Sequence, residues 1–265
     1  MSFNTLAAYQ TARDQLLAKI IDTLHNDDRF VAAWLTGSYG RGEIDAVSDL
    51  DLNVVVGAAD AVDLCARPQM VQAGTTHPRL GLISQFGQPV IIHENHFNAP
   101  ANGSFTFVLY ADNALMIDWT LIPQAQAQRP QMAQLLFDKI GIAVQPIAEP
   151  DAAQCHDILA EKTAFFWMML AVTAKYMVRQ DAVKVQGFLD ILHHLLQDIE
   201  HLLDGQGLHY RRGSLMELQV TRDAQLMTCR VLIQRMRNLK PQLMSMGIDL
   251  PSAPAEAIER LLDLH

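Results

Sequence analysis

The chain has 265 residues, half of them hydrophobic, which is enough for one large domain or two of ordinary size. Its formal net charge of −9 argues against a broad nucleic-acid surface, because such a surface needs a basic stripe. The same acidity would attract a polycationic small molecule.

Cysteine usage and hydropathy favour a cytoplasmic protein. Cys65, Cys155 and Cys229 are far apart and form no CxxC pair, as expected for reduced thiols. The first residues lack a basic start followed by an apolar block, so we expect no signal peptide. The most hydrophobic run, 165–172, is far shorter than the ~20 residues of a membrane span. We therefore expect no membrane contact.

The first elements in the chain predict a helix and then a strand. Residues 5–26 carry leucine and isoleucine at helical spacing, and the apolar run 30–36 (FVAAWLT) predicts a strand buried on both faces. Gly37 follows; glycine takes backbone angles closed to other residues and lets a ligand approach the main chain. Ser38 adds a hydroxyl and can cap a short helix over 39–43, whose free N–H groups favour an anion.

Charged residues follow this turn. Arg41 brings a fixed positive charge suited to phosphate oxygens. Asp49 and Asp51 begin the next strand, whose apolar run 52–56 enters the core. Side chains at i and i+2 of a strand share a face, so the two carboxylates converge and repel unless a cation lies between them. Mg²⁺ takes one or two carboxylates and completes its shell with phosphate and water. The combination predicts a phosphate cradle beside a divalent-metal site.

The segment after this strand predicts a hairpin, with strands over 81–86 and 89–94. Glu94 at its end is a candidate acceptor-site residue, either as a base or as a contact for a cationic substrate. His93 and His96 invite a transition-metal interpretation, but no cysteine or further histidine completes a ligand set, so we favour surface histidines.

A third carboxylate lies in the next hairpin, which is predicted over 104–111 and 114–122. Asp118 is in mid-strand among apolar residues, and burying a carboxylate without a partner costs several kcal/mol. One interpretation is a structural aspartate bonded to an arginine or a backbone amide. With Asp49 and Asp51 nearby in the predicted fold, we favour the interpretation as a third member of the metal site.

The second half of the chain predicts helices only. We expect an α+β protein with a sheet domain over 1–125, a connecting segment over 126–150 that includes a helix at 131–140, and a helical bundle over 151–265. The expected bundle helices are 151–180, 182–204, one or two over 214–239 (ended before Pro241) and 254–264.

These motifs resemble a known signature. Gly37-Ser38, Arg41-Gly42 and Ser48-Asp49-Leu50-Asp51 are similar to the signature of the polymerase-β-like nucleotidyltransferase superfamily, whose small members include the aminoglycoside and lincosamide nucleotidyltransferases. The resemblance covers about 30–122 and implies a mixed sheet. It further implies that the Gly-Ser turn holds a triphosphate, that the aspartate pair binds Mg²⁺, and that a carboxylate on a neighbouring strand completes the site.

The resemblance also implies a basic residue from the helical half on the triphosphate. Lys175 is our candidate, with Arg179 one turn further along the same helix. A Lys/Arg pair solvated at a helix end remains the alternative. The basic cluster Tyr210-Arg211-Arg212 is interpreted as a solvated turn rather than a substrate contact.

The expected activity is the transfer of a nucleoside monophosphate, AMP from ATP, onto a hydroxyl of a small molecule, with release of pyrophosphate. Gly37, Ser38, Arg41, Ser48 and Lys175 are the expected nucleotide-binding residues. The expected metal-binding and catalytic residues are Asp49, Asp51 and Asp118, which would hold two Mg²⁺ ions about 3.5–4 Å apart. The acceptor suggested by the resemblance is an aminoglycoside- or lincosamide-like antibiotic.

Two other functions stay open at this point. One is nucleotide transfer onto a protein side chain, and the other is a non-catalytic nucleotide-binding regulator. The expected partners are a nucleoside triphosphate and a small hydroxylated acceptor, without extended nucleic-acid binding. A homodimer is also left open.

Overall fold

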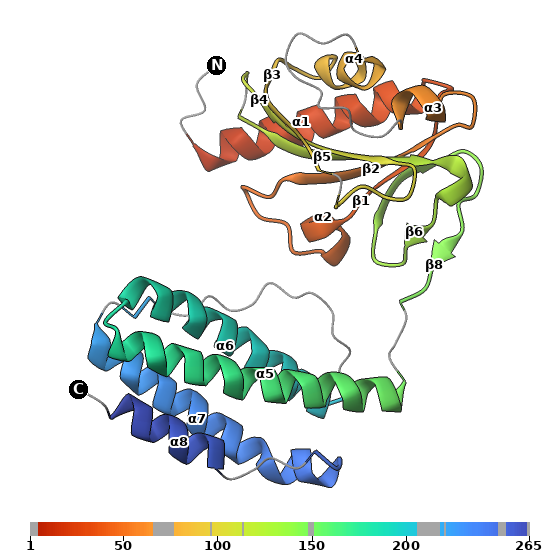
Figure 1. Cartoon of the computed structure of the whole chain (residues 1–265). Helices are drawn as coiled ribbons and strands as arrows, with labels where there is room; N and C mark the ends of the chain where they lie inside the picture. Colours follow the sequence, from red (N-terminus) through yellow and green to blue (C-terminus); the bar gives the residue numbers. More distant parts are fainter. Residues whose placement is uncertain are drawn as a thin grey trace. The chain divides into compact units, whose positions relative to one another are not determined.

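A computed structural model describes the chain as two compact units, Met1–Ile147 and Ala148–His265. Figure 1 shows an α/β unit followed by a unit of helices. The described residues are 5–65, 77–95, 97–112, 114–147, 151–205, 218–219, 221–248 and 253–263. The expected α+β class, with a mixed sheet first and helices second, is confirmed.

The first unit is built on a six-stranded mixed sheet in the order β3-β4-β5-β2-β1-β7. Its β2 and β5 strands run parallel, whereas the other neighbouring pairs are antiparallel. A two-stranded parallel sheet pairs β6 with β8. The strands are β1 (Phe30–Leu35), β2 (Leu50–Val56), β3 (Pro89–Glu94), β4 (Ser104–Tyr110), β5 (Met116–Pro123), β6 (Arg129–Pro130), β7 (Gln134–Asp138) and β8 (Val144–Gln145).

Helices lie on both faces of this sheet. In Figure 1, α1 (Leu6–His25), α3 (Ala61–Leu64) and α4 (Pro78–Ser84) lie on one side, and α2 (Gly37–Arg41) lies on the other. A short 3-10 helix, Gln124–Gln126, follows β5. The main core is on the α1 side, where alternate residues of β2 and β5 are fully buried. The intervening residues of both strands point to the opposite face, which is where the aspartates lie.

Two local predictions in this unit were wrong. Residues 81–86 were expected as a strand but belong mostly to α4. This helix begins at Pro78, and the side chain of His77 caps it by accepting a hydrogen bond from the Arg79 amide. Residues 131–140 were expected as a helix, but they contain β7, which pairs with β1 at the sheet edge. In both cases contacts with distant residues override a short local pattern.

The connecting stretch therefore contributes to the first unit. The expected connection over 126–150 contains β6, β7 and β8, and the first unit extends to Ile147. This stretch belongs to the first unit because β7 pairs with β1. Without β7, β1 would be an exposed edge strand of the sheet.

The second unit consists of four helices in its described residues: α5 (Ala152–Val178), α6 (Ala182–Leu203), α7 (Arg222–Ser245) and α8 (Ala253–Leu262). Their buried leucine, isoleucine and methionine side chains form one core. The predicted cap of the first of these helices is confirmed, because Asp151 and Gln154 exchange hydrogen bonds as a capping box. No helix in the described ranges combines the length and apolar character needed to cross a membrane.

The predicted end of α7 was wrong. The helix does not stop before Pro241 but continues to Ser245 with the proline inside it. A proline in a helix interior removes one hydrogen bond and costs about 3 kcal/mol. Burial of Leu243 in the core, one half-turn further on, offsets part of this cost and keeps the last turn helical.

Candidate active site

Two of the predicted site carboxylates lie side by side. The parallel register of β2 and β5 pairs Asp51 with Asp118. Each is flanked by fully buried residues that point into the core on the α1 side, so the two half-buried carboxyl groups share the opposite face. Asp118 is therefore a neighbour of Asp51 although 67 positions, 118 minus 51, separate them in the chain. The pairing depends on the parallel β2–β5 arrangement.

Both carboxyl groups of the pair have raised pKa values. Burial, followed by the charges of Asp51 and Asp49, raises the pKa of Asp118 to about 6. Burial also raises the pKa of Asp51, Asp49 adds to the effect, and Arg41 opposes it. One oxygen of Asp118, Oδ1, is buried without a hydrogen-bond partner. An unpaired buried oxygen between like charges is the environment that a cation would stabilise.

Asp49 lies one residue before β2 and acts on both partners through its charge. In the described part of the chain, no group of three or more His, Cys, Asp or Glu side chains is arranged to hold a metal ion. Asp51 and Asp118 still fit Mg²⁺ in their chemistry, because this ion accepts one or two carboxylates and takes its other ligands from phosphate and water. The metal-binding role of the three aspartates stays a prediction.

The Gly-Ser turn lies directly against this pair. Gly37 has a φ of +57°, and a Cβ placed on it would overlap Oδ2 of Asp51. The next residue, Ser38, has a buried hydroxyl oxygen without a hydrogen-bond partner. The turn is also connected to β2, because the Thr36 amide donates to the Asp51 carbonyl (3.0 Å) and Asn53 Nδ2 donates to the Thr36 hydroxyl (3.0 Å). The structure thus brings Gly37, Ser38 and Asp51 together.

We expect Gly37→Ala to be far more damaging than Gly42→Ala. Both glycines have positive φ, +57° and +72°, so alanine at either position costs about 1–2 kcal/mol of backbone strain. A Cβ at position 42 meets nothing within 4 Å, whereas one at position 37 displaces the Asp51 carboxylate, at a further cost of about 1–3 kcal/mol. Urea denaturation of both variants measures the difference. Equal losses would show that Gly37 is not packed against Asp51.

Two further predicted nucleotide-binding residues already have partners nearby. Arg41 forms an ion pair with Glu43, with 2.9 Å between Nε and Oε2, and its charge also reaches Asp51. The Ser48 hydroxyl donates to Asp45 Oδ1 (3.0 Å) and accepts from the Asp45 amide (2.9 Å). Ser48 therefore stabilises the turn before β2 in this structure, and nucleotide contacts by Ser48 and Arg41 stay predictions.

Glu94 is not brought to the aspartates. Its neighbour His93 is in register with Phe107, which pairs with Asp118, so alternation along β3 places Glu94 on the other face. There Glu94 accepts two bonds from Arg79, each 3.1 Å, and one from the Thr106 hydroxyl, 2.9 Å. Both members of the ion pair are almost fully buried. This geometry gives Glu94 a structural partner in place of the expected acceptor contact.

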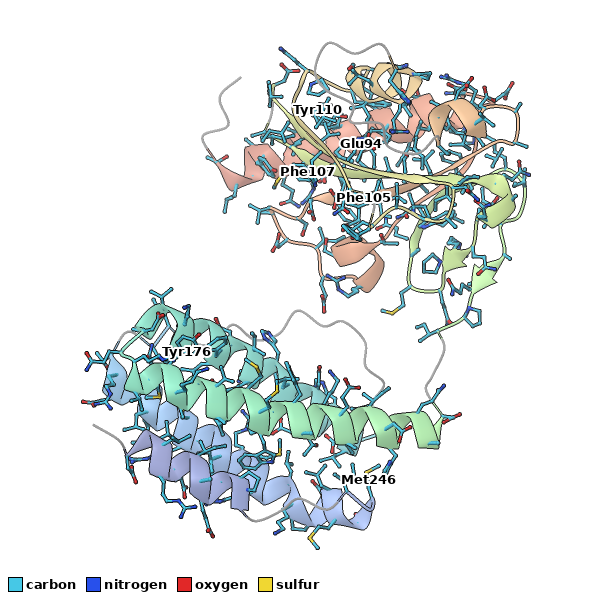
Figure 2. All side chains as sticks on the ribbon, in the orientation of Figure 1. Glu94, Phe105, Phe107, Tyr110, Tyr176 and Met246 are labelled. Carbon is cyan, nitrogen blue, oxygen red and sulfur yellow. The ribbon has the colours of Figure 1, made fainter. Side chains whose placement is uncertain are left out.

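Figure 2 labels side chains from both faces of the sheet. Glu94 and Tyr110 belong to the face covered by α4, where the Tyr110 hydroxyl donates to the Ile83 carbonyl. Phe105 and Phe107 belong to the face that carries Asp118.

The remaining predicted residues belong to the second unit or fall outside the described residues. Lys175 is in the last turn of α5 in the second unit, with its ammonium 5.1 Å from the Tyr176 ring centroid, and its contact with a triphosphate stays a prediction. Arg179 lies 5.3 Å from the same ring. His96 and the cluster 210–212 fall outside the described residues.

The sequence did not single out two buried arginines that support the site and the sheet. Arg13 in α1 and Arg79 in α4 are 2% and 0% exposed. In the sequence, each appears as a single arginine on the apolar face of a helix. Such a pattern does not show which residues the arginine contacts. Both partners are distant in sequence, so only the folded chain identifies them.

The fold and this site define an α+β protein with an acidic cluster beside a Gly-Ser turn, on the face of a mixed sheet that carries α2 (Figure 1). No family model matches the chain, and no curated protein matches it. Among solved structures, it is similar to one described as "putative nucleotidyltransferase from H. pylori", with 12% sequence identity, 87% of this chain and 97% of the other covered, and a TM-score of 0.24.

Proposed function

We propose that the protein is a Mg²⁺-dependent nucleotidyltransferase that moves a nucleoside monophosphate, AMP from ATP, onto a hydroxyl of a small molecule. The observation that supports this most strongly is the in-register pair of Asp51 and Asp118 beside the Gly-Ser turn. The pair has a buried oxygen without a partner, and the turn has a buried hydroxyl without one. The first suits a hard cation and the second suits a phosphate oxygen.

Each residue has a stated part in this proposal. Gly37 lets a triphosphate approach the main chain, Ser38 donates to its β- or γ-phosphate, and Arg41 offsets its charge. Asp49 and Asp51 would hold Mg²⁺, which when bound neutralises phosphate charge and favours departure of pyrophosphate.

Asp118 either completes the metal site through its unpartnered oxygen or acts as the base in this scheme. Its pKa of about 6 lies close to neutral pH, so the carboxylate can accept a proton from the acceptor hydroxyl as that oxygen attacks the α-phosphorus. The acceptor class is drawn from the sequence resemblance, and an aminoglycoside- or lincosamide-like compound is the first to test.

The test measures pyrophosphate release from ATP and Mg²⁺ in the presence of a panel of hydroxylated antibiotics. We expect acceptor-dependent release by the wild type and a loss of about 10²–10³-fold in Asp51→Asn, equivalent to several kcal/mol of transition-state stabilisation. The matched control is Asp63→Asn, an exposed carboxylate of α3, which should keep full activity. Full activity in Asp51→Asn would contradict the proposal.

One observation favours a non-catalytic nucleotide-binding regulator instead. In the described residues, the carboxylates do not form a ready-made metal set. A regulator of this kind would bind ATP in a way that depends on Ser38. It would release no pyrophosphate from ATP, whichever small-molecule acceptor or protein is added. Nucleotide binding by equilibrium dialysis, measured beside the release assay, separates the two functions.

A further inference from the structure

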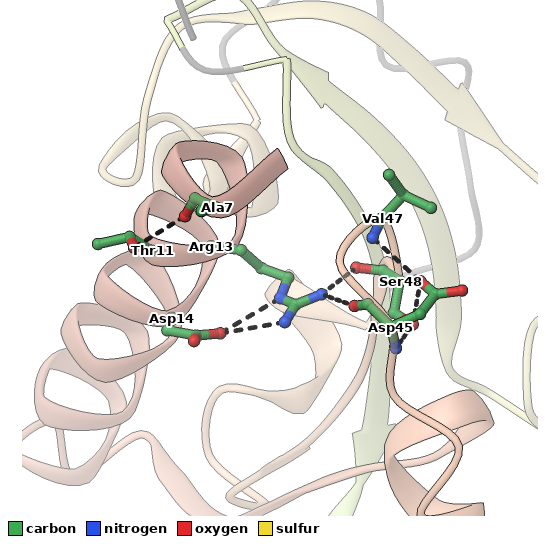
Figure 3. Close-up of polar contacts among 7 residues, drawn as sticks. All are labelled: Ala7, Thr11, Arg13, Asp14, Asp45, Val47 and Ser48. Carbon is green, nitrogen blue, oxygen red and sulfur yellow. Dashed lines mark hydrogen bonds and ion pairs between the residues drawn. The ribbon is translucent and has the colours of Figure 1, made fainter. Parts of the chain in front are cut away.

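The loop that carries Asp49 is held by an arginine from a distant helix. Arg13 of α1 is only 2% exposed, and its Nη1 donates to the carbonyl oxygens of Asp45 (2.7 Å) and Ser48 (3.1 Å). Figure 3 shows the guanidinium reaching from the helix to both ends of this short turn. A buried cation is costly unless it is paired and hydrogen-bonded, and Arg13 meets this condition with backbone oxygens from the loop.

The rest of the guanidinium connects α1 with α2. Nε and Nη2 donate to Asp14 Oδ1 at 3.3 and 3.2 Å, and the guanidinium carbon lies 5.5 Å from the centroid of the Tyr39 ring. A planar guanidinium with several donors in a fixed geometry is suited to such a junction, and a lysine cannot reproduce it. Arg13 therefore fixes the loop relative to two elements that flank the site.

The turn that Arg13 holds is itself well ordered by local bonds. Asp45 Oδ1 accepts from the Val47 amide and from the Ser48 hydroxyl, both at 3.0 Å. Bonds of this kind form an Asx-type turn that shapes the backbone locally. They do not place the turn relative to the sheet, which is what the bonds from Arg13 do.

Asp49 depends on this support more than the other carboxylates do. Asp51 and Asp118 lie within β2 and β5, where ladder bonds set their positions. Asp49 precedes β2, so no ladder pair includes it. The Ser48 carbonyl that accepts from Arg13 belongs to the peptide group that joins Ser48 to Asp49. Holding this oxygen sets the plane of that peptide and thus the direction in which the Asp49 side chain leaves the backbone.

We propose that Arg13 is a positioning residue, which holds the backbone of Asp49 beside Asp51 and Asp118 and thereby raises the affinity of the carboxylate cluster for a divalent cation. This inference rests on the proposed function. A purely structural Arg13 would instead support folding and leave cation affinity in the folded protein unchanged.

The test uses Arg13→Gln in the full chain and measures Mn²⁺ binding by electron paramagnetic resonance. We expect affinity to fall by about 10–100-fold, the usual cost of losing a group that orients a metal ligand. Asp14→Asn is the matched control, because it alters a guanidinium partner but leaves both carbonyl bonds in place, and it should bind within about threefold of the wild type.

A double-mutant cycle with Asp49→Asn shows whether Arg13 acts through Asp49. In the Asp49→Asn background, Arg13→Gln should cause no further loss. Unchanged Mn²⁺ affinity in folded Arg13→Gln, or an equal loss in both backgrounds, would overturn the inference. If Arg13→Gln does not fold, Arg13→Lys keeps the charge on a shorter side chain, which weakens the two carbonyl bonds that Nη1 makes, and an intermediate loss is expected. If neither variant folds, the role is structural and the inference is wrong.

The wild-type result separates this inference from the proposed function. If wild-type protein binds no Mn²⁺, the proposed function fails and the inference fails with it. If the wild type binds Mn²⁺ in an Asp51-dependent way but Arg13→Gln binds equally well, only the inference fails.

Discussion

Replacing Asp118 by asparagine is expected to stabilise the protein at neutral pH and to remove the proposed transferase activity. Burial and the charges of Asp51 and Asp49 together raise the pKa of Asp118 from 3.8 to about 6, so the folded chain bears a cost when this carboxyl is charged. The difference corresponds to about 3 kcal/mol, which solvent screening at this half-buried group reduces to on the order of 1 kcal/mol. Asparagine keeps the shape without the charge, so the variant avoids the cost.

The stability gained in Asp118→Asn should depend on pH. Below about pH 3 the Asp118 carboxyl is protonated in both the folded and the unfolded chain, so wild type and variant should be equally stable. Between about pH 4 and 7 the folded wild type keeps a proton that the unfolded chain has lost, and its free energy of unfolding falls as the pH rises through the folded pKa. The advantage of Asp118→Asn should therefore open across this window and stay constant above it.

Urea denaturation in a Trp167→Phe background measures this effect, because the tryptophan fluorescence then reports only on Trp34 and Trp119 of the first unit. Asp138→Asn is a control of opposite sign. Although burial acts against it, three backbone amides that donate to Asp138 lower its pKa, so this carboxylate stabilises the fold at neutral pH. A gain from Asp118→Asn that did not change with pH would contradict the assignment.

Activity and cation binding should move in the opposite direction to stability. Asp118→Asn lacks a carboxylate to accept the proton of the acceptor hydroxyl, and transfer should fall by about 10²–10⁴-fold. Mg²⁺ should raise the Tm of the wild type, because a ligand that binds only the folded state stabilises it, and should raise that of the variant less. A protein that becomes more stable and less active together is the pattern expected of a strained catalytic group.

Glu94→Ala is expected to lower the free energy of unfolding of the first unit by about 3–5 kcal/mol. The change removes the carboxylate that accepts two bonds from Arg79, whose side chain is fully buried, and leaves the Thr106 hydroxyl without this acceptor. The physical source of the loss is a buried guanidinium that keeps its bond to the Leu64 carbonyl but has lost its carboxylate.

Two further variants make this prediction specific. Glu94→Gln keeps the shape and an acceptor oxygen for Thr106, so it should lose less than Glu94→Ala. The double variant Arg79→Met, Glu94→Leu replaces the ion pair with apolar groups and should recover much of the stability. Transfer activity measured per folded molecule should be unchanged in Glu94→Gln. A loss of activity without a loss of stability would instead support the predicted acceptor contact of Glu94.

Much of the fold follows from short-range patterns. The helix over 5–26, the strand at 30–36, the hairpin at 104–122 and the capped helix from Asp151 are all confirmed, because each combines a clear period with a recognisable start or stop. The ambiguous segments were those with ten residues or fewer and no strong period, at 81–86 and 131–140. For these the local preference is weak, and packing decides.

The features of the site also fall into those that local sequence sets and those that tertiary contacts set. The sequence by itself determined that a glycine, a serine and two aspartates flank a pair of buried strands, because local backbone chemistry and strand alternation dictate their spacing. Only the tertiary structure decided that Asp118 pairs with Asp51, that Glu94 faces the other side with Arg79, and that Arg13 holds the loop before Asp49. Each of these depends on strand order or on contacts between distant residues, and no local pattern in one chain encodes them.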